Sequence, residues 1–241
     1  MLYTAVGAVI AGGLLISLGL AIFSKPSSCF NRAQDGDERG VDCGGSCALI
    51  CPFDARAPVV LWTRVFQVAP GFYTAAAYVE NHNVGAGAKN VRYSFKLYDE
   101  RGILVKEQIG VINIPPISVI PIIEPSINVG NRTVASASFA FGDEEILWTK
   151  NTHEIPTLRI TQPKPSSDFS RLSATIANDS LEDVHNLTLT AVLFDRQGVA
   201  RAASKSAIPL LARRSSQDVV FTWGSGVPNI VRAEITLLPA F

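Results

Sequence analysis

Four cysteines are the residues of this chain whose type and spacing most directly imply chemistry. They are Cys29, Cys43, Cys47 and Cys51, and no cysteine follows them in the 241 residues. The segment around them is rich in turn residues and nearly free of core residues before Val41, so cross-links must replace a hydrophobic core. We expect two disulfides, for which four cysteines allow three pairings.

A metal centre is the alternative use of these cysteines. Four thiolates can hold zinc or an iron–sulfur cluster, but the spacing here is C-x13-C-x3-C-x3-C. This spacing lacks the C-x2-C pairs that present two thiolates to one zinc ion. Free thiols are a third alternative. The spacing therefore favours disulfides over a metal site.

An acidic, glycine-containing loop lies between the first two cysteines. Its oxygen-bearing side chains are Asn31, Asp35, Asp37, Glu38 and Asp42. Carboxylate and amide oxygens suit Ca²⁺, which takes about six to eight oxygen ligands. The spacing is not that of an EF-hand loop, and a solvated acidic turn explains the same residues. Calcium is the one candidate cofactor, with plain turn chemistry as the alternative.

The rest of the chain has no recognisable catalytic pattern. The three histidines, His82, His153 and His185, are scattered, and the sequence has no H-E-x-x-H, phosphate-binding loop or nucleophile elbow. We therefore expect no enzymatic activity. Lysine plus arginine equals aspartate plus glutamate, 21 against 21, without a long basic run, which argues against nucleic acid as a partner.

An apolar segment precedes the cysteines. Residues 4–23 carry no charge, and as a helix these 20 residues would span about 30 Å, the hydrocarbon thickness of a bilayer. Gly7, Ala11 and Gly19 would allow close helix packing and self-association. A cleaved signal peptide is the main alternative, but a basic start and an A-x-A cleavage site are missing. Acylation of Cys29, as in a lipoprotein, is a weaker alternative to the transmembrane anchor. We expect a single-pass transmembrane anchor over residues 1–25.

Two features give opposite orientations for this anchor. Lys25, Arg32 and Arg39 follow the apolar segment, which favours a cytoplasmic body by the positive-inside rule. Disulfides, however, persist only in oxidising compartments, and long domains translocate largely regardless of charge. We expect the globular part to lie outside the cytoplasm.

After the cysteines, apolar and polar residues alternate with period two, as in half-buried strands. One such strand covers residues 91–98 and ends in Asp99-Glu-Arg-Gly102, and a second covers 187–194 and ends in Asp195-Arg-Gln-Gly198. A constant offset of 96 relates Asn90 to Asn186, Leu97 to Leu193, Asp99 to Asp195 and Gly102 to Gly198. The chain therefore contains an internal duplication of a β-sandwich unit.

The expected fold class is all-β, with two tandem β-sandwiches after the transmembrane helix and a small cysteine-rich module. The expected boundaries are 26–57 for the cysteine-rich module, 58–141 for the first sandwich, 142–155 for a charged connector and 156–241 for the second sandwich.

Short motifs carry a resemblance to known families. Phe95-Lys-Leu-Tyr-Asp99 reproduces the signature of FxLYD domains, and Ala191-Val-Leu-Phe-Asp195 is similar with Ala in place of Phe. The resemblance implies immunoglobulin-like sandwiches of bacterial envelope proteins, without a known shared catalytic site. The stretch from Asp35 to Cys47 resembles Asp-Gly and Cys-Gly-Gly segments of secreted and cell-surface bacterial proteins.

The most unusual apolar run of the body covers residues 109–123. Prolines 115, 116 and 121 exclude a helix and a central strand, leaving edge strands and a kinked connection. The run either crosses between sheets with its isoleucines in the core or forms an exposed ridge for a partner. The residues of the expected ridge are Ile117, Val119, Ile120 and Ile122.

Together these features favour a membrane-anchored, non-catalytic binding or scaffolding protein outside the cytoplasm, with other envelope proteins as its partners. A structural subunit of a surface appendage or secretion assembly is the alternative, although no early glutamate of the pilin kind is present. A hydrolase with a site between the sandwiches is a third.

Overall fold

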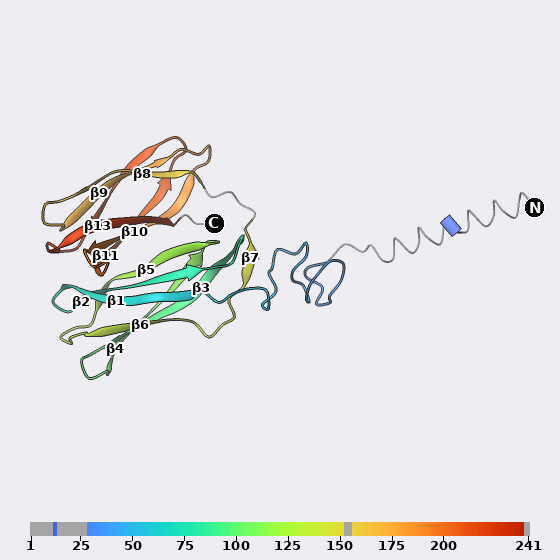
Figure 1. Ribbon diagram of the computed structural model, residues 1–241, viewed down its shortest axis with the longest axis horizontal. Coiled ribbons are helices and arrows are strands. Elements are labelled where there is room, and N and C mark those ends of the chain that lie inside the picture. The colour runs from blue at the N-terminus through green and yellow to red at the C-terminus, as the bar shows by residue number, and fades with distance from the viewer. Residues whose placement is uncertain (1–11, 14–27, 152–155, 239–241) are drawn as a thin grey trace, which may run out of the picture. The chain divides into compact units, whose positions relative to one another are not determined.

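The computed structural model describes residues 12–13, 28–151 and 156–238 (Figure 1). Most of the expected transmembrane anchor lies outside the described residues, as does part of the expected connector. Gly12 and Gly13 are helical. Across the described ranges, no helix combines the length and the apolar character needed to cross a membrane.

The chain divides into two compact units, residues 1–56 with 147–150, and residues 57–146 with 151–241. The smaller unit contains the cysteine-rich module and strand β7 (Trp148–Lys150), which belongs by sequence to the expected connector. The larger unit contains both β-rich halves of the chain. Four residues of the connector, 147–150, are therefore part of the disulfide-bonded unit.

The larger unit is built from antiparallel strands. In its first half these are β1 (Val59–Ala69), β2 (Phe72–Asn81), β3 (Ala86–Tyr98), β4 (Leu104–Ile114), β5 (Ser118–Asn128) and β6 (Ser136–Phe141). In its second half they are β8 (Leu158–Pro165), β9 (Arg171–Asn178), β10 (Val184–Asp195), β11 (Ala200–Leu211), β12 (Ser216–Thr222) and β13 (Ile230–Leu238).

These strands form four sheets, two from each half. The first half has the orders β1-β2-β5 and β4-β3-β6, and the second half has β8-β9-β12 and β11-β10-β13. The two sheets of each half pack face to face as a β-sandwich. In the second sandwich, for example, Leu172 and Ile176 of β9 share one core cluster with Leu189 and Leu193 of β10.

The structure confirms that the two sandwiches have the same strand order and the same turns. Asn90 and Asn186 both adopt a left-handed backbone, with φ of 55° and 51°. Asp99 and Asp195 each end a central strand, and each carboxylate accepts hydrogen bonds from two backbone N–H groups of its turn. Gly102 and Gly198 supply the positive φ, 74° in both. The duplicated residues therefore serve equivalent turns.

A second duplicated pair lies deep in the sandwiches. Asn81 and Asn178 are each 1% exposed. The Asn178 side-chain amide donates to the carbonyl oxygens of Glu182, Leu211 and Ala212 at 2.8, 3.1 and 3.3 Å. Asn81 likewise donates to two carbonyl oxygens. Each asparagine pairs backbone carbonyls that would otherwise be buried without a partner.

The two sandwiches also pack against each other. Outward-facing side chains of sheet β1-β2-β5 meet those of sheet β11-β10-β13 in one apolar cluster, and β11 lies beside β5 (Figure 1). The members of this inter-sandwich cluster are Trp62, Phe66, Ala76, Tyr78, Ile123, Val192, Phe194, Ala200 and Ala203. Strands β2 and β10 are consequently buried on both faces, which explains their long apolar runs.

Aromatic contacts fix the geometry of this cluster. The Trp62 ring stacks on Tyr78 with centroids 4.6 Å apart, and Tyr78 meets the Phe194 ring edge-on at 6.3 Å. The Tyr78 hydroxyl donates to Glu234 Oε2 at 3.0 Å. Burial, partly opposed by the charge of Arg232, raises the pKa of Tyr78 to about 12, so the hydroxyl remains a donor at neutral pH.

We predict that Asn178→Ala lowers the free energy of unfolding by about 1–3 kcal/mol, because it leaves buried carbonyl oxygens without a donor. Urea unfolding followed by tryptophan fluorescence measures the change. Asn131→Ala, in an exposed loop, is the matched control and should shift stability by less than about 0.5 kcal/mol. Equal effects of the two substitutions would contradict the structural role of Asn178.

Candidate functional site

The four cysteines form two disulfides. Cys29 pairs with Cys47 and Cys43 pairs with Cys51, which leaves no free cysteine in the described chain. This confirms the expectation of two disulfides and selects one of the three pairings. It also overturns the thiolate-metal alternative, since no thiolate is left to bind a metal ion.

Glycines of the module are required where the chain passes close to itself. A Cβ on Gly40 would lie 2.9 Å from Cys43 Sγ and 3.2 Å from Cys51 Sγ, so this glycine packs on the second disulfide. Gly45 has φ of +53°, and a Cβ there would collide with the carbonyl oxygen of Asp37. The Cys-Gly-Gly pattern therefore follows from tight packing.

The acidic side chains of the loop accept hydrogen bonds from the module itself. The Asp42 carboxylate accepts from the backbone N–H groups of Asn31 and Arg32, each at 2.9 Å. Asp35 accepts from the backbone N–H of Ser28 at 2.8 Å and from the Asn31 amide at 2.6 Å. These carboxylates replace the backbone pairing that a larger domain would obtain from regular secondary structure.

The remaining two acidic residues have similar partners. Glu38 is 7% exposed, and its Oε2 accepts from the backbone N–H groups of Asp35 and Asp42, both at 3.2 Å. Asp37 accepts from the Ser46 hydroxyl at 2.9 Å. Each residue of the expected calcium set thus has a structural partner, and calcium binding stays a prediction.

Strand β7 completes this unit, which the sequence did not indicate. Ile50 N donates to Trp148 O and Lys150 N donates to Ala48 O, both at 2.8 Å. The Lys150 ammonium donates to the carbonyl of Gly45. Trp148, 4% exposed, is the buried anchor of the strand. A tryptophan in an otherwise charged connector was the one available signal for this role.

The structure divides the expected apolar ridge into two classes of side chain. Ile120 and Ile122 are buried, at 2% and 1% exposure, so neither is available to a partner. Ile117 and Val119 are exposed, at 63% and 46%. Strand β5, which carries Pro121, is an edge strand of its sheet. The isoleucines beyond the turn thus enter the core, and the surface patch is limited to Ile117 and Val119.

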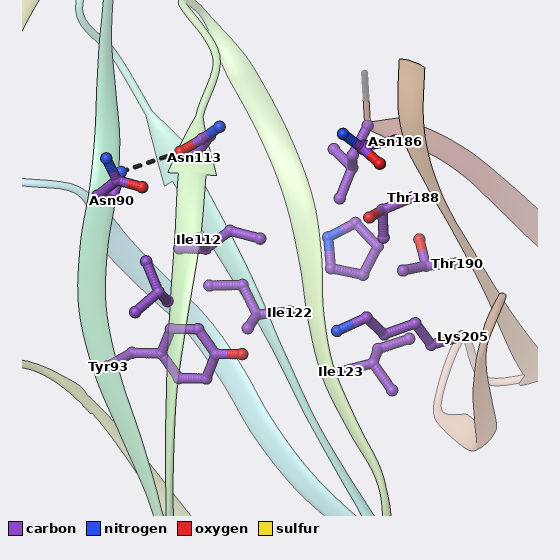
Figure 2. Close-up of a pocket in the computed structure, with 13 residues that line it drawn as sticks. Asn90, Tyr93, Ile112, Asn113, Ile122, Ile123, Asn186, Thr188, Thr190 and Lys205 are labelled. Atoms are coloured by element: carbon purple, nitrogen blue, oxygen red, sulfur yellow. Dashed lines mark hydrogen bonds between the residues drawn. The ribbon is translucent and has the colours of Figure 1, made fainter. Parts of the chain in front are cut away.

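A cleft opens between the two sandwiches, beside their shared apolar cluster. Figure 2 shows side chains from β3, β4 and β5 on one wall and from β10 and β11 on the other. Its volume is about 290 Å³. The lining residues are Asn90, Tyr93, Val111, Ile112, Asn113, Pro121, Ile122, Ile123, Asn186, Thr188, Thr190, Lys205 and Leu238. The sequence suggested a site between the sandwiches only as a third alternative and did not indicate which residues would line it.

The first-sandwich wall of the cleft is held by Tyr93. Its hydroxyl donates to Glu124 Oε1 at 2.6 Å and so joins β3 to β5 of the opposing sheet. Burial, the hydrogen bond to Glu124 and the charge of that carboxylate all raise the pKa of Tyr93. Gly110 lies opposite Tyr93 on β4, where a Cβ would collide with the tyrosine ring. The wall is therefore tightly packed.

The ionisable group with the clearest structural role in the second sandwich is Asp195, 4% exposed. Burial acts to raise its pKa, but donation from the backbone N–H of Val199, the Arg201 guanidinium and the backbone N–H of Gln197 outweighs burial and lowers it. Arg201 Nε lies 2.6 Å from Asp195 Oδ2. The turn and Arg201 thus occupy the carboxylate with hydrogen bonds, so it is not available to a ligand.

Comparison with known proteins gives little further information. No family model and no curated protein matches the chain. The crystal structure of red sea bream transglutaminase matches over 76% of this chain, with 8% sequence identity and a TM-score of 0.25. The chain covers 29% of that structure. Similarity of this size carries no inference about activity or partners, and the FxLYD resemblance rests on its motif residues alone.

We predict that Asp195→Asn destabilises the protein at pH 7 and that the difference from wild type shrinks in acid. The native state lowers the pKa of Asp195, so the stabilisation is complete above the unfolded-state value of about 3.9 and is lost as the pH falls through the lower native value. Urea unfolding at pH 7 and pH 3 measures both differences.

The matched control for this comparison is Asp143→Asn, which removes a carboxylate from an exposed loop. It should change stability little at either pH. A difference between wild type and Asp195→Asn that is as large at pH 3 as at pH 7 would show that the charge of Asp195 does not stabilise the turn.

Proposed function

We propose that this chain is a single-pass, membrane-anchored protein of a bacterial cell envelope, with its body outside the cytoplasm, and that the body binds or positions other envelope proteins without catalysis. The observation that carries the proposal is the disulfide-bonded module, Cys29 to Cys51, placed directly after an uncharged apolar segment. The two sandwiches are, in this proposal, immunoglobulin-like domains of the FxLYD type.

The disulfides support the location. Cysteine pairs are kept reduced in the cytosol and persist in oxidising compartments. In this module the disulfides stand in for a core, because the segment from Asn31 to Gly40 has a single buried side chain, that of Glu38. A module that depends on its disulfides for folding would be unstable where thiols remain reduced.

The contact between the sandwiches supports a positioning role. Two domains joined by a flexible linker hold their partners at variable distances, whereas here aromatic rings of both sandwiches interlock. Arg232 lies over the Phe194 ring, with its guanidinium carbon 4.3 Å from the centroid. Phe194 in turn contacts Tyr78 of the first sandwich. A body of this kind presents both of its sandwiches in one arrangement.

The outward faces favour a closed body over an open-ended assembly. The positions equivalent to Val192 and Ala203 in the first sandwich are Lys96 and Glu107, whose charged atoms lie 3.9 Å apart. The position equivalent to Tyr78 in the second sandwich is Thr175. Copies of the chain therefore lack, at these positions, the apolar residues with which the two sandwiches bind each other.

Thiol labelling in intact cells tests the location. Cys47→Ser frees Cys29, which is half-buried in the native module and should react with a membrane-impermeant maleimide without reductant. The wild-type protein should react only after reduction, since both disulfides protect it. Labelling of wild-type cysteines only after lysis, without reductant, would place the module in the cytoplasm and refute the proposal.

Crosslinking in the native membrane, followed by mass spectrometry, tests the role. A scaffold should yield crosslinks to a small set of distinct envelope proteins, whereas an assembly subunit should yield a ladder of self-crosslinks. Because Lys96, Glu107 and Thr175 occupy the positions equivalent to the inter-sandwich contact, we expect distinct partners. A ladder, or recovery of the monomer alone, would count against a scaffolding role.

A further inference from the structure

The surface that the second sandwich turns toward the first changes character along two neighbouring strands. At one end of β10 and β11, the side chains of Val192, Phe194 and Ala203 belong to the apolar inter-sandwich cluster. Further along the same strands, Thr188, Thr190 and Lys205 line the cleft instead. Apolar side chains therefore fill the space between the sandwiches at one end of these strands. At the other end the space is a cleft lined partly by polar groups.

Comparison of the two repeats shows that Lys205 is not required by the sandwich itself. Thr190 pairs with Lys205 across β10 and β11, and the equivalent pair in the first sandwich is Ser94 with Ile109. The second repeat therefore has a cation where the first has an isoleucine. The Lys205 ammonium forms no ion pair and no hydrogen bond with residues 28–151 or 156–238.

The directions of the side chains make this lysine part of the cleft. In Figure 2 the Lys205 side chain extends from the second sandwich toward Ile122 and Tyr93 of the first. No carboxylate is among the residues that line the cleft, and the nearby Glu124 accepts the hydrogen bond of Tyr93. Within the part of the chain that the structure describes, the exposed Lys205 ammonium therefore has no carboxylate partner in the cleft.

The other groups of the cleft are amides on both walls, hydroxyls on the wall formed by the second sandwich, and aliphatic side chains mainly on the wall formed by the first. Asn90 and Asn186, which are equivalent in the duplication, both line it, and Asn113 Oδ1 accepts from the backbone N–H of Asn90 at 2.9 Å. Half-buried Ile112 supplies the accessible aliphatic surface, since Ile122 is only 1% exposed. A matching ligand carries a carboxylate, amide groups and a small aliphatic side chain.

We propose that this cleft binds the C-terminal end of a peptide, with the terminal carboxylate on Lys205, the last amide groups on the asparagines and Thr188, and a small aliphatic side chain against Ile112. The volume of about 290 Å³ lies at the lower end of small-molecule sites, about 300–1,000 Å³, and admits only a few residues. The inference rests on the proposed binding function and identifies the partner by its free C-terminus.

Calorimetric titration of the full chain in detergent tests this inference. The probes are N-acetyl-Ala-Ala with a free carboxylate and the same peptide with a C-terminal amide. The free acid should bind at least about tenfold more tightly than the amide, since the ammonium pairs with the carboxylate, and added salt should weaken its binding. Lys205→Met should weaken binding of the acid by at least about tenfold.

A matched variant separates this site from general charge effects. Lys164→Met removes an exposed lysine from β8, on the other sheet of the second sandwich, and should leave the affinity for the acid unchanged. An unchanged thermal midpoint of Lys205→Met shows that the variant is folded; if it does not fold, the comparison of acid with amide on the wild-type protein decides alone.

Several results would overturn the assignment. These are equal binding of acid and amide, unchanged binding by a folded Lys205→Met variant, and no binding of the acid at millimolar concentration. If acetate or glucuronate binds as tightly as the peptide acid, the ligand of the cleft is a simple anion or an acidic sugar and not a peptide. None of these results bears on thiol labelling of Cys29, so failure of the peptide site and failure of the proposed location are distinguishable.

Discussion

The apolar contact between the two sandwiches is the interaction on which the larger unit depends. It converts β2 and β10 from half-exposed strands into strands buried on both faces, and it joins two small cores into one body. Each large apolar side chain buried in this way contributes roughly 1.5–3 kcal/mol, which small sandwiches need because they bury a limited share of their surface. The apolar contact does not extend to Thr190 and Lys205. The cleft lies where this contact is missing.

The disulfide-bonded unit solves the opposite problem, folding without a core. Its two disulfides reduce the conformational entropy of the unfolded chain, and its glycines allow close approach of the backbone. Its carboxylates accept hydrogen bonds from backbone N–H groups that are not paired in any strand. Strand β7 adds a short segment from far along the chain and brings Trp148 into the unit. Residues 26–57 are therefore incomplete without residues 147–150, and any study of the acidic loop requires the longer chain.

Local patterns predicted the repeated features because each of these depends on residues close in sequence. Alternation from Val91 to Leu97 predicted a central strand, and the Asp99 and Asp195 turns predicted its end. The cleft could not be predicted in this way, because Ile122 and Lys205 meet only through the packing of whole sheets. Pairing of Cys29 with Cys47 was one of three equivalent options. For the apolar run, the sequence left open whether the isoleucines near Pro121 enter the core or form an exposed ridge. Ile120 and Ile122 lie in the core, as the first of these interpretations expected.

The divergence of the duplicated positions has a consequence for how this gene can change. Recombination between the two repeats would keep a turn carboxylate and a buried amide at the equivalent positions, since Asp99 and Asp195, and Asn81 and Asn178, make similar hydrogen bonds. It would nevertheless place Lys96 and Glu107 in the buried contact, or Phe194 on an exposed face. Selection against such exchange should therefore act on the few side chains between the sandwiches, and the two halves should remain alike in backbone while diverging in sequence there.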